Sequence, residues 1–363
     1  RGLGDVYKRQ LWYHSHSHGV TAEQVYGGLS GLIIVDEETS DNGKLPSEYG
    51  LDDLPLIIQD RAFTHTGELA YFKRGPALMH GFRAHQIVVN GAIRPTAEVP
   101  TGLTRLRLLN GSNARIYDLE FHDRRPFTLI AGDGGFLPQP LRVNKVRISP
   151  GERAEILLDL SSGKEAILRN VPKAGNSPSG MMGMMMGGGN ERFSVMRIVP
   201  TARAQATAIG LPDTLVSLPD ESGQIPHRIR KMQLEMLMGP GMMMGRGMGR
   251  APFSINGVAL DMAAINFRVK GNSTEVWEVS NDSVLAHPFH IHNTQFQVLA
   301  RSGRSILPSE NGLKDTVLVY PGEAVRLRVP FPEFVDSQYP YMYHCHILEH
   351  EDAGMMGQFT VES

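Results

Sequence analysis

Short apolar runs separated by turn signals dominate the pattern of hydrophobic and polar positions along this chain. In the middle of the sequence, turn dipeptides such as Asn90-Gly91 and Pro150-Gly151 separate apolar runs at 56–58, 87–89, 106–109, 127–130 and 154–158. Strands of this length with glycine and proline turns between them are typical of a β-sandwich or barrel. No long helical period competes with them, so the pattern predicts an all-β fold.

The same pattern indicates how the chain is divided. Residues 54–200 form one expected β domain, and residues 227–363 form another, with strands expected at 275–279, 296–299, 316–319 and 325–329. Residues 41–53 and 201–226 are polar, proline-containing stretches that we interpret as linkers. Residues 11–40 are too short for a complete domain, and residues 1–10, which begin without methionine, are interpreted as a foreign or artefactual segment.

Composition excludes several classes of protein. The formal net charge of −2 over 363 residues leaves no electrostatic footprint for nucleic acid. No apolar run approaches the roughly 20 residues of a membrane span. The chain contains one cysteine, which rules out an internal disulfide.

That cysteine is the first sign of chemistry. Cys345 lies between His344 and His346, with His350 and Met355 following. A thiolate, an imidazole and a weak thioether are the ligands of blue-copper electron-transfer sites. If residues 342–346 form a strand, Cys345 faces one side while its histidine neighbours face the other, so two metal sites would meet at this strand. The alternative is a buried free cysteine beside ordinary histidines.

Three His-x-His pairs can be read in separate segments of the chain, at 14/16, 290/292 and 344/346, and His18 lies just beyond the first of them. On a strand, each pair places two imidazoles on one face, roughly 6.5 Å apart. Three converging pairs would surround a metal cluster. His287 is outside these pairs and is free to join Cys345 and His350 in a His₂Cys set, with Met355 as the long axial ligand.

These segments resemble the copper motifs of the multicopper oxidases. The second, third and fourth motifs of that family match Trp12-Tyr13-His14-Ser15-His16-Ser17-His18-Gly19, His287-Pro288-Phe289-His290-Ile291-His292 and the segment from His344 to Met355. The resemblance implies consecutive cupredoxin-like Greek-key β-sandwich domains, of which the first is incomplete and the second binds no copper. It implies copper as cofactor, with one type 1, one type 2 and two type 3 ions in the full-length protein.

The ligand roles follow from the same resemblance. The type 1 ion would take His287, Cys345, His350 and Met355. The type 2 ion would take His290. The type 3 ions would take His14, His16, His292, His344 and His346. The family's cluster uses four histidine pairs, whereas this chain has three, so we expect that the chain as given does not assemble a complete cluster.

The function implied is the one-electron oxidation of a reductant coupled to four-electron reduction of dioxygen to water. Electrons would pass through Cys345 to His344 and His346, and Glu351 matches an acidic position associated with proton delivery. Of two methionine tracts, one at 181–186 and one at 232–248, the second resembles the Met-rich insert of copper-tolerance oxidases that oxidise Cu(I), for which thioethers are suitable soft ligands. The candidate substrate ligands are Met236, Met238, Met242, Met243, Met244 and Asp282.

Three alternatives stay open. A laccase acting mainly on phenols would differ from a Cu(I) oxidase only in the substrate that binds near the type 1 copper. A copper nitrite reductase also uses cupredoxin domains, but the three histidine pairs favour the dioxygen-reducing cluster. From another class, the protein could bind copper without catalysis or act as a scaffold, above all if only this piece is present. The resemblance further implies an exported, periplasmic protein that is a monomer.

Overall fold

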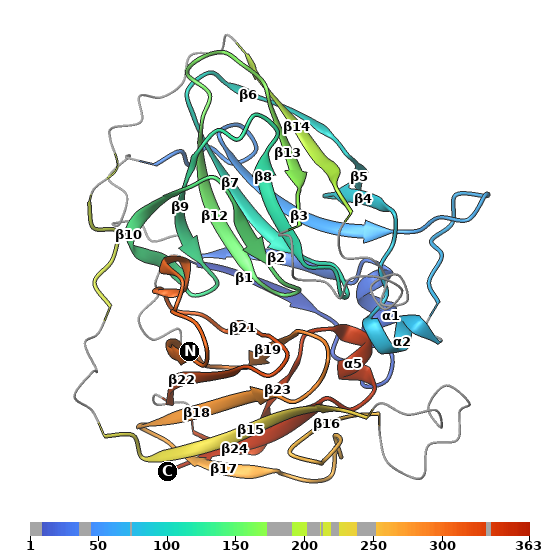
Figure 1. The fold of residues 1–363 in the computed structure, drawn as a ribbon, viewed down its shortest axis with the longest axis vertical. Coiled ribbons are helices and arrows are strands. Elements are labelled where there is room, and N and C mark those ends of the chain that lie inside the picture. The colour runs from blue at the N-terminus through green and yellow to red at the C-terminus, as the bar shows by residue number, and fades with distance from the viewer. Residues whose placement is uncertain are drawn as a thin grey trace. The chain divides into compact units, whose positions relative to one another are not determined.

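The protein is almost entirely built of β-strands, as the apolar pattern predicts. The computed structural model describes residues 9–35, 45–72, 75–172, 191–201, 211, 213–218, 225–237, 252–331 and 335–363. These residues form two compact units (Figure 1). The middle unit contains residues 9–15 and 23–217, and the C-terminal unit contains residues 16–22 and 218–363, in each case as far as they are described.

The middle unit contains two large sheets. The seven-stranded sheet has the order β10-β9-β12-β7-β3-β4-β5, and the five-stranded sheet has the order β11-β8-β13-β14-β6. The strands are β3 (Asp53–Arg61), β4 (Gln86–Val89), β5 (Ala92–Ile93), β6 (Thr96–Pro100), β7 (Leu103–Asn110), β8 (Tyr117–Phe121), β9 (Phe127–Gly132), β10 (Gly135–Val143), β11 (Val146–Ile148), β12 (Arg153–Asp159), β13 (Ala166–Asn170) and β14 (Phe193–Thr201).

Alternate residues of these strands make the core of the middle unit. Leu56 and Ile58 of β3 and Leu106 and Leu108 of β7 pack in one cluster with Phe121 of the facing sheet, all nearly inaccessible to solvent. Each such buried side chain contributes on the order of 1.5–3 kcal/mol. The turn between β4 and β5 uses Asn90 (φ 50°) and Gly91 (φ 82°), residue types that tolerate positive φ in a tight hairpin. The predicted two-residue turn signal is therefore confirmed.

Buried charges lie on β3, β7 and β12 of the seven-stranded sheet. Arg105 and Arg107 lie on β7, and Glu155 of β12 accepts hydrogen bonds from Arg105 Nε at 2.8 Å and from Arg107 Nη1 at 3.3 Å. Arg107 Nε also donates to Asp53 at 2.7 Å. Each buried charge thus has an opposite partner, without which its burial would be costly.

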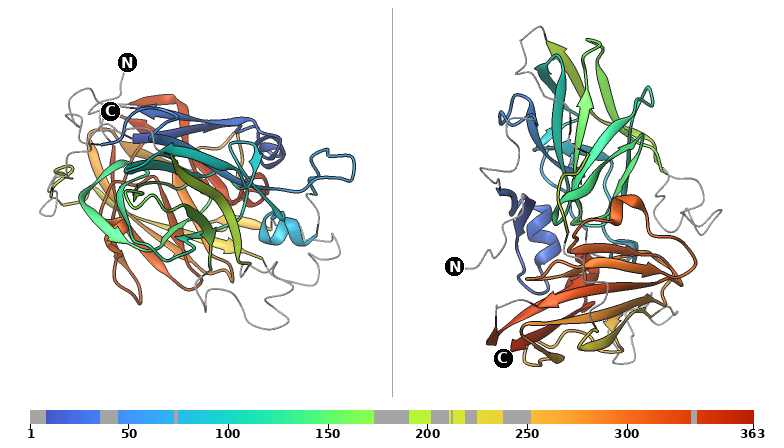
Figure 2. Two further views of the ribbon diagram at one scale, coloured as in Figure 1. Left: turned by 90° about the horizontal axis from the view of Figure 1, so that it is seen from above. Right: turned by 90° about the vertical axis from the view of Figure 1, so that its left-hand side faces the viewer.

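The C-terminal unit has two five-stranded sheets, which Figure 2 shows from two further directions. The first has the order β16-β15-β18-β22-β20, and the second has the order β17-β24-β23-β19-β21. The strands are β15 (Arg228–Met236), β16 (Phe253–Ile255), β17 (Phe267–Lys270), β18 (Ser273–Asn281), β19 (His287–Ile291), β20 (Gln297–Arg301), β21 (Thr316–Val319), β22 (Ala324–Phe331), β23 (Asp336–Cys345) and β24 (Met356–Glu362).

Aromatic side chains fill the core of this unit. Trp277 of β18 is fully buried, with its ring centroid 5.7 Å from Phe359 of β24, 6.0 Å from Tyr343 of β23 and 6.4 Å from Phe289 of β19. Of these strands, β19 and β23 carry candidate ligands. Core packing thereby fixes where the histidines of these strands lie.

The first described segment is a two-stranded antiparallel sheet of β1 (Arg9–His14) and β2 (Ser30–Val35). β1 begins at Arg9, two residues before Leu11, where the first segment was expected to start. Gln10 belongs to this strand because it pairs with Ile34 of β2 and its carbonyl accepts a hydrogen bond from Arg153 Nε at 3.0 Å. Helices among the described residues are short: α1 (Thr21–Tyr26), α2 (Pro76–His80), the 3₁₀ helix η1 (Pro308–Glu310) and α5 (Leu348–Asp352). None of them is long and apolar enough to cross a membrane.

Candidate metal centre

Two groups of metal-ligating side chains lie in the C-terminal unit. One consists of His287, Cys345 and His350, and the other of His16, His292 and His344. Within each group the potential ligand atoms lie within 4.8 Å of one another. The predicted separation of Cys345 from His344 is therefore present, because these neighbours in β23 belong to different groups.

The first group is compact and fully buried. Cys345 Sγ lies 3.3 Å from His287 Nδ1 and 3.8 Å from His350 Nδ1, and the two Nδ1 atoms are 3.3 Å apart. A metal ion lies ~2.0–2.3 Å from each nitrogen or sulfur ligand. Three ligand atoms around one ion are then roughly 3.5 Å from one another. The observed spacings fit one ion held by one thiolate and two imidazoles.

Neighbouring groups orient these side chains. The Ser283 hydroxyl lies 2.7 Å from His287 Nε2, so the other ring nitrogen, Nδ1, is the one that faces Cys345. The backbone N–H of Ile347 donates to Cys345 Sγ at 3.4 Å. Phe253 of β16 stacks on the His350 ring, with centroids 4.1 Å apart and planes 21° apart. Nothing in the spacing of the sequence pointed to Ser283 or Phe253, since neither belongs to a histidine motif.

Burial sets the protonation of this group. It lowers the pKa of His287 to about 3, which keeps the imidazole neutral and able to bind a metal at neutral pH. Burial likewise raises the pKa of the Cys345 thiol. A bound cation would reverse that preference, because metal coordination deprotonates a thiol.

Met355 lies beside this group through the turn that follows α5. Its N–H donates to the His350 carbonyl at 2.9 Å, and its own carbonyl accepts from the Cys345 N–H at 3.0 Å. Gly354 makes this turn with φ 105°, a conformation that glycine adopts without strain. Met355 is fully buried.

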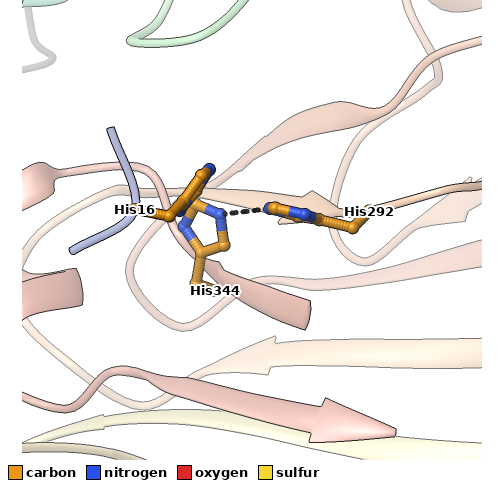
Figure 3. Close-up of side chains that lie close together, drawn as sticks. All are labelled: His16, His292 and His344. Atoms are coloured by element: carbon orange, nitrogen blue, oxygen red, sulfur yellow. Dashed lines mark hydrogen bonds between the residues drawn. The ribbon is translucent and has the colours of Figure 1, made fainter. Parts of the chain in front are cut away.

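The second group is made by three imidazoles that converge from separate segments (Figure 3). His292 Nε2 lies 3.1 Å from His344 Nε2. The His16 ring centroid lies 4.8 Å from that of His292 and 5.5 Å from that of His344. Burial, followed by the neighbouring histidines, lowers the pKa of His292 well below its usual value, so this imidazole is also neutral.

Two further predicted ligands lie next to this group. The His290 ring centroid is 5.0 Å from that of His292, and the His346 centroid is 5.4 Å from that of His344. His290 Nδ1 lies 2.8 Å from the Asp315 carbonyl and 3.1 Å from the Thr316 hydroxyl, which leaves Nε2 for a metal. No sequence motif contains these orienting residues, because the pairing of β19 with β21 brings them close to His290.

The histidine pairs differ from the predicted geometry in one respect. Each was expected to lie wholly on a strand, but β1 ends at His14, β19 at Ile291 and β23 at Cys345. The second histidine of each pair, His16, His292 or His346, therefore follows the end of a strand. Its ring is positioned by a turn and by neighbouring groups, as well as by strand alternation.

Glu351 binds two histidines of the second group from α5. Its two carboxylate oxygens lie 3.2 Å from His16 Nδ1 and 3.2 Å from His344 Nδ1, and the side chain is 2% exposed. Burial alone would raise the pKa of Glu351, but His344 and His16 outweigh it and hold that pKa well below its ordinary value. Conversely, burial would lower the pKa of His344, and Glu351 raises it. The Glu351 carboxylate is therefore not a solvated surface charge.

The remaining candidates lie in the middle unit, elsewhere in the C-terminal unit, or outside the described residues. His14 belongs to the middle unit, where its ring centroid lies 4.2 Å from that of Trp12. Asp282 is exposed and accepts a hydrogen bond from Gln233 Nε2 at 2.5 Å, and Met236 is the last residue of β15. Met238, Met242, Met243 and Met244 lie outside the described residues.

The sheets and the His₂Cys group together define a cupredoxin-type copper protein. Sequence models of the multicopper oxidases match residues 10–166 and 234–363. The chain belongs to the multicopper oxidase family, whose members are copper oxidoreductases.

Individual relatives agree with this assignment. Multicopper oxidase mco of Staphylococcus aureus is 34% identical over 355 residues, covering 97% of this chain and 68% of that protein. The cell division protein FtsP of Sodalis glossinidius is 36% identical over 355 residues, covering 96% of this chain and 69% of that protein. Among solved structures, a laccase-like multicopper oxidase CueO from Ochrobactrum has a TM-score of 0.82 at 35% identity, covering 98% of this chain and 77% of its own.

Copper, the metal that this family implies, fits the donors that are present. The first group offers the soft thiolate and two imidazoles that suit copper, at mutual distances that one ion can bridge. The second offers three imidazoles, two of which, His16 and His344, have a carboxylate oxygen of Glu351 at 3.2 Å from Nδ1, a neighbour that is usual for metal-ligating histidines.

Proposed function

We propose that this chain acts in a multicopper oxidase that couples one-electron oxidation of Cu(I), and secondarily of phenols, to four-electron reduction of dioxygen to water. The observation that carries the proposal is that adjacent residues of β23, His344 and Cys345, serve two separate donor groups. For each dioxygen, four Cu(I) ions would lose one electron each, four protons would be taken up and two waters would form. The dioxygen and Cu(I) roles extend the family assignment.

The donor groups divide the work. His287, Cys345 and His350 would hold the type 1 ion, and the buried thioether of Met355 would be a further, weaker ligand. Copper bound there would accept and pass on single electrons. His290 would take the type 2 role. His14, His16, His292, His344 and His346 would take type 3 roles, His14 by its match to the family motif.

Cys345 supplies the covalent path between the groups. Its backbone joins His344 on one side and His346 on the other, so an electron arriving at its sulfur would cross only a few bonds to reach either imidazole. Both the cysteine and these histidines are at most 1% exposed, which excludes water from the path. This rigid, dry connection favours electron transfer over side reactions of the thiol.

Glu351 has two tasks in this proposal. Its carboxylate accepts from His16 Nδ1 and lies 3.2 Å from His344 Nδ1, which also has the Cys345 carbonyl at 3.1 Å, so the Nε2 atoms of both rings would be left for the metal. The same carboxylate would pass protons to reduced oxygen. We expect Glu351→Gln to lose turnover while retaining the blue absorption of the type 1 site. Unchanged turnover would reject the relay role.

Cu(I) as substrate is supported by the methionines that follow β15. Met236 is the last residue of β15 and pairs with Phe253 of β16. The Phe253 ring stacks on that of His350. In the sequence, the Met-rich segment 238–251 lies between β15 and β16. The pairing of these two strands places Phe253 against His350, one of the type 1 donors. Asp282 donates its backbone N–H to Leu234 of β15 at 3.2 Å, which places its carboxylate beside the same strand.

A substitution experiment tests this substrate. Replacing Met238, Met242, Met243 and Met244 with leucine keeps side-chain size but removes the sulfur ligands. The rate of Cu(I) oxidation should fall at least tenfold more than that of a phenol, because only Cu(I) needs thioether donors. The same replacement at Met181, Met182, Met184, Met185 and Met186 is the matched control. Equal losses with both substrates would favour a laccase acting mainly on phenols.

That laccase is the alternative within the same class. The related Ochrobactrum protein is described as having oxidase activity towards lignin model compounds and lignosulfonate. The relative rates with Cu(I) and with a phenol decide between the two substrates.

A non-catalytic role is the alternative from another class. The FtsP relative, named for cell division, is as similar to this chain as the oxidase mco is. A copper-loaded protein that consumes dioxygen with Cu(I) or a phenol would exclude a purely structural role, and a copper-loaded protein without such activity would favour it. By resemblance to its relatives, we also propose export to the periplasm, a role in copper tolerance and a monomeric state.

A further inference from the structure

Asp352, the last residue of α5, binds the backbone of a segment far away in the sequence. Its Oδ1 accepts the N–H of Thr21 at 2.9 Å, and its Oδ2 accepts the N–H of Ala22 at 3.1 Å. Thr21 and Ala22 are the first residues of α1, and both are at most 1% exposed. One carboxylate thus binds two buried amides at the start of this helix.

These amides need a partner from outside their own helix. The first N–H groups of any α-helix have no acceptor within it, and a side-chain oxygen of the preceding residue normally supplies one. The residue before α1 is Val20, whose side chain contains no oxygen. A negative charge at this end of a helix is also favourable because of the helix dipole. Asp352 performs the capping role from α5.

The bound segment leads directly to His16. The Thr21 hydroxyl donates to the Ser17 carbonyl at 3.1 Å, and the Val20 N–H donates to the same carbonyl at 3.0 Å. Residues 17–21 are therefore closed into one turn, with His16 immediately before it. Fixing Thr21 fixes the position from which the His16 side chain extends.

Consecutive residues of α5 thus bind this segment at two points. Glu351 accepts from the His16 ring, and Asp352 accepts from the backbone five and six residues later. Glu351 controls the orientation of the imidazole, but one contact to the ring cannot fix where the backbone lies. The two contacts together define both.

We propose that Asp352 is a positioning residue that holds the 16–22 segment on α5 so that His16 reaches His292 and His344. The proposal rests on the proposed function, in which these three histidines bind copper. It assigns to Asp352 a share of the copper affinity of the second group, exerted through the backbone of Thr21 and Ala22. The type 1 group does not depend on this contact.

The test compares the unsubstituted chain with Asp352→Ala and Asp352→Asn. Hydrogen exchange on metal-free protein reports whether the Thr21 and Ala22 amides are released. Titration with Cu(II) against a competing chelator measures the affinity of non-blue copper, while the blue absorption monitors the His287, Cys345 and His350 group. We expect Asp352→Ala to speed exchange at both amides and to weaken non-blue Cu(II) binding by about tenfold or more. The blue absorption should be unchanged.

The amide in Asp352→Asn retains one acceptor oxygen, so its effect should lie between those of aspartate and alanine. Asp336 provides the matched control, because its Oδ1 also accepts two backbone N–H groups, from Gln338 and Tyr339, each at 2.9 Å. Asp336→Ala should leave non-blue Cu(II) affinity unchanged.

Three results would overturn the inference: unchanged exchange in Asp352→Ala, faster exchange with unchanged Cu(II) affinity, or an equal affinity loss in Asp336→Ala. If the unsubstituted chain binds no Cu(II) beyond the blue site, the proposed function fails, and the inference fails with it. That outcome is distinguished from the other three because it is seen before any residue is changed.

Discussion

His344 and Cys345 are consecutive residues of β23, yet their side chains approach different partners. His344 Nε2 lies 3.1 Å from His292 Nε2, whereas Cys345 Sγ lies 3.3 Å from His287 Nδ1. Strand alternation sends the two side chains to opposite faces. The pairing of β23 with β19 then supplies each face with a histidine, since His287 and His290 also lie on opposite faces of their strand.

Ser283 should matter to the type 1 site although it cannot bind the metal itself. Its hydroxyl, 2.7 Å from His287 Nε2, keeps Nδ1 turned toward Cys345. We expect Ser283→Ala to weaken copper binding at the blue site by about 10–100-fold, as is usual when a partner of a ligand histidine is removed. Chelator competition followed by the blue absorption measures this. Ser302→Ala, which removes an exposed hydroxyl that accepts from Ala324, is the control and should change nothing. Equal affinity in the two variants would contradict the assigned role.

Phe253 should contribute both stability and protection. Its ring is fully buried and covers His350. Phe253→Ala should reduce the free energy of unfolding by about 3–5 kcal/mol, the usual cost of removing a buried phenyl ring. It should also speed reduction of the blue site by a phenol, because His350 becomes accessible.

Denaturant unfolding and stopped-flow bleaching of the blue colour measure the two effects. Phe72→Ala, at a residue that is 66% exposed, should change neither. A fully stable Phe253→Ala protein with unaltered bleaching would show that the ring neither supports nor covers the site.

The buried charges of the middle unit predict a pH dependence of stability. Burial alone raises the pKa of Glu155, but Arg105 and Arg107 outweigh it and hold that pKa below its ordinary value. A carboxyl with a depressed folded-state pKa stabilises the fold above its unfolded pKa, about 4.3 for glutamate. That stabilisation is lost as the pH falls from there through the folded-state pKa.

Unfolding curves between neutral pH and pH 3 test this contribution. Glu155→Gln should lose about 3–5 kcal/mol at pH 7, because two buried arginines lose a shared partner, and its stability should fall less steeply below the unfolded pKa. Glu165→Gln breaks the exposed pair with Arg197 and should cost about 1 kcal/mol or less. Parallel pH profiles for the parent and Glu155→Gln would contradict the assignment.

Much of the fold and of the site follows from local sequence patterns. Short apolar runs between turn signals were enough to predict strands such as β3 and β7, and the His-Cys-His spacing was enough to separate Cys345 from His344. The short helices were not predicted, because helices of five or six residues are too brief to show a periodic pattern. Ser283, Asp315, Phe253 and Asp352 were missed for another reason. They act through contacts created when distant strands and turns pack together, and no spacing within one segment encodes those contacts.

The most direct test of the account is the visible absorption of the purified chain after loading with Cu(II). The His287, Cys345 and His350 group predicts an intense blue colour, which Cys345→Ser should abolish while non-blue Cu(II) binding at the second group is kept. A parent protein that takes up Cu(II) but stays colourless, with Cys345 still free to react with a thiol reagent once unfolded, would contradict the central claim.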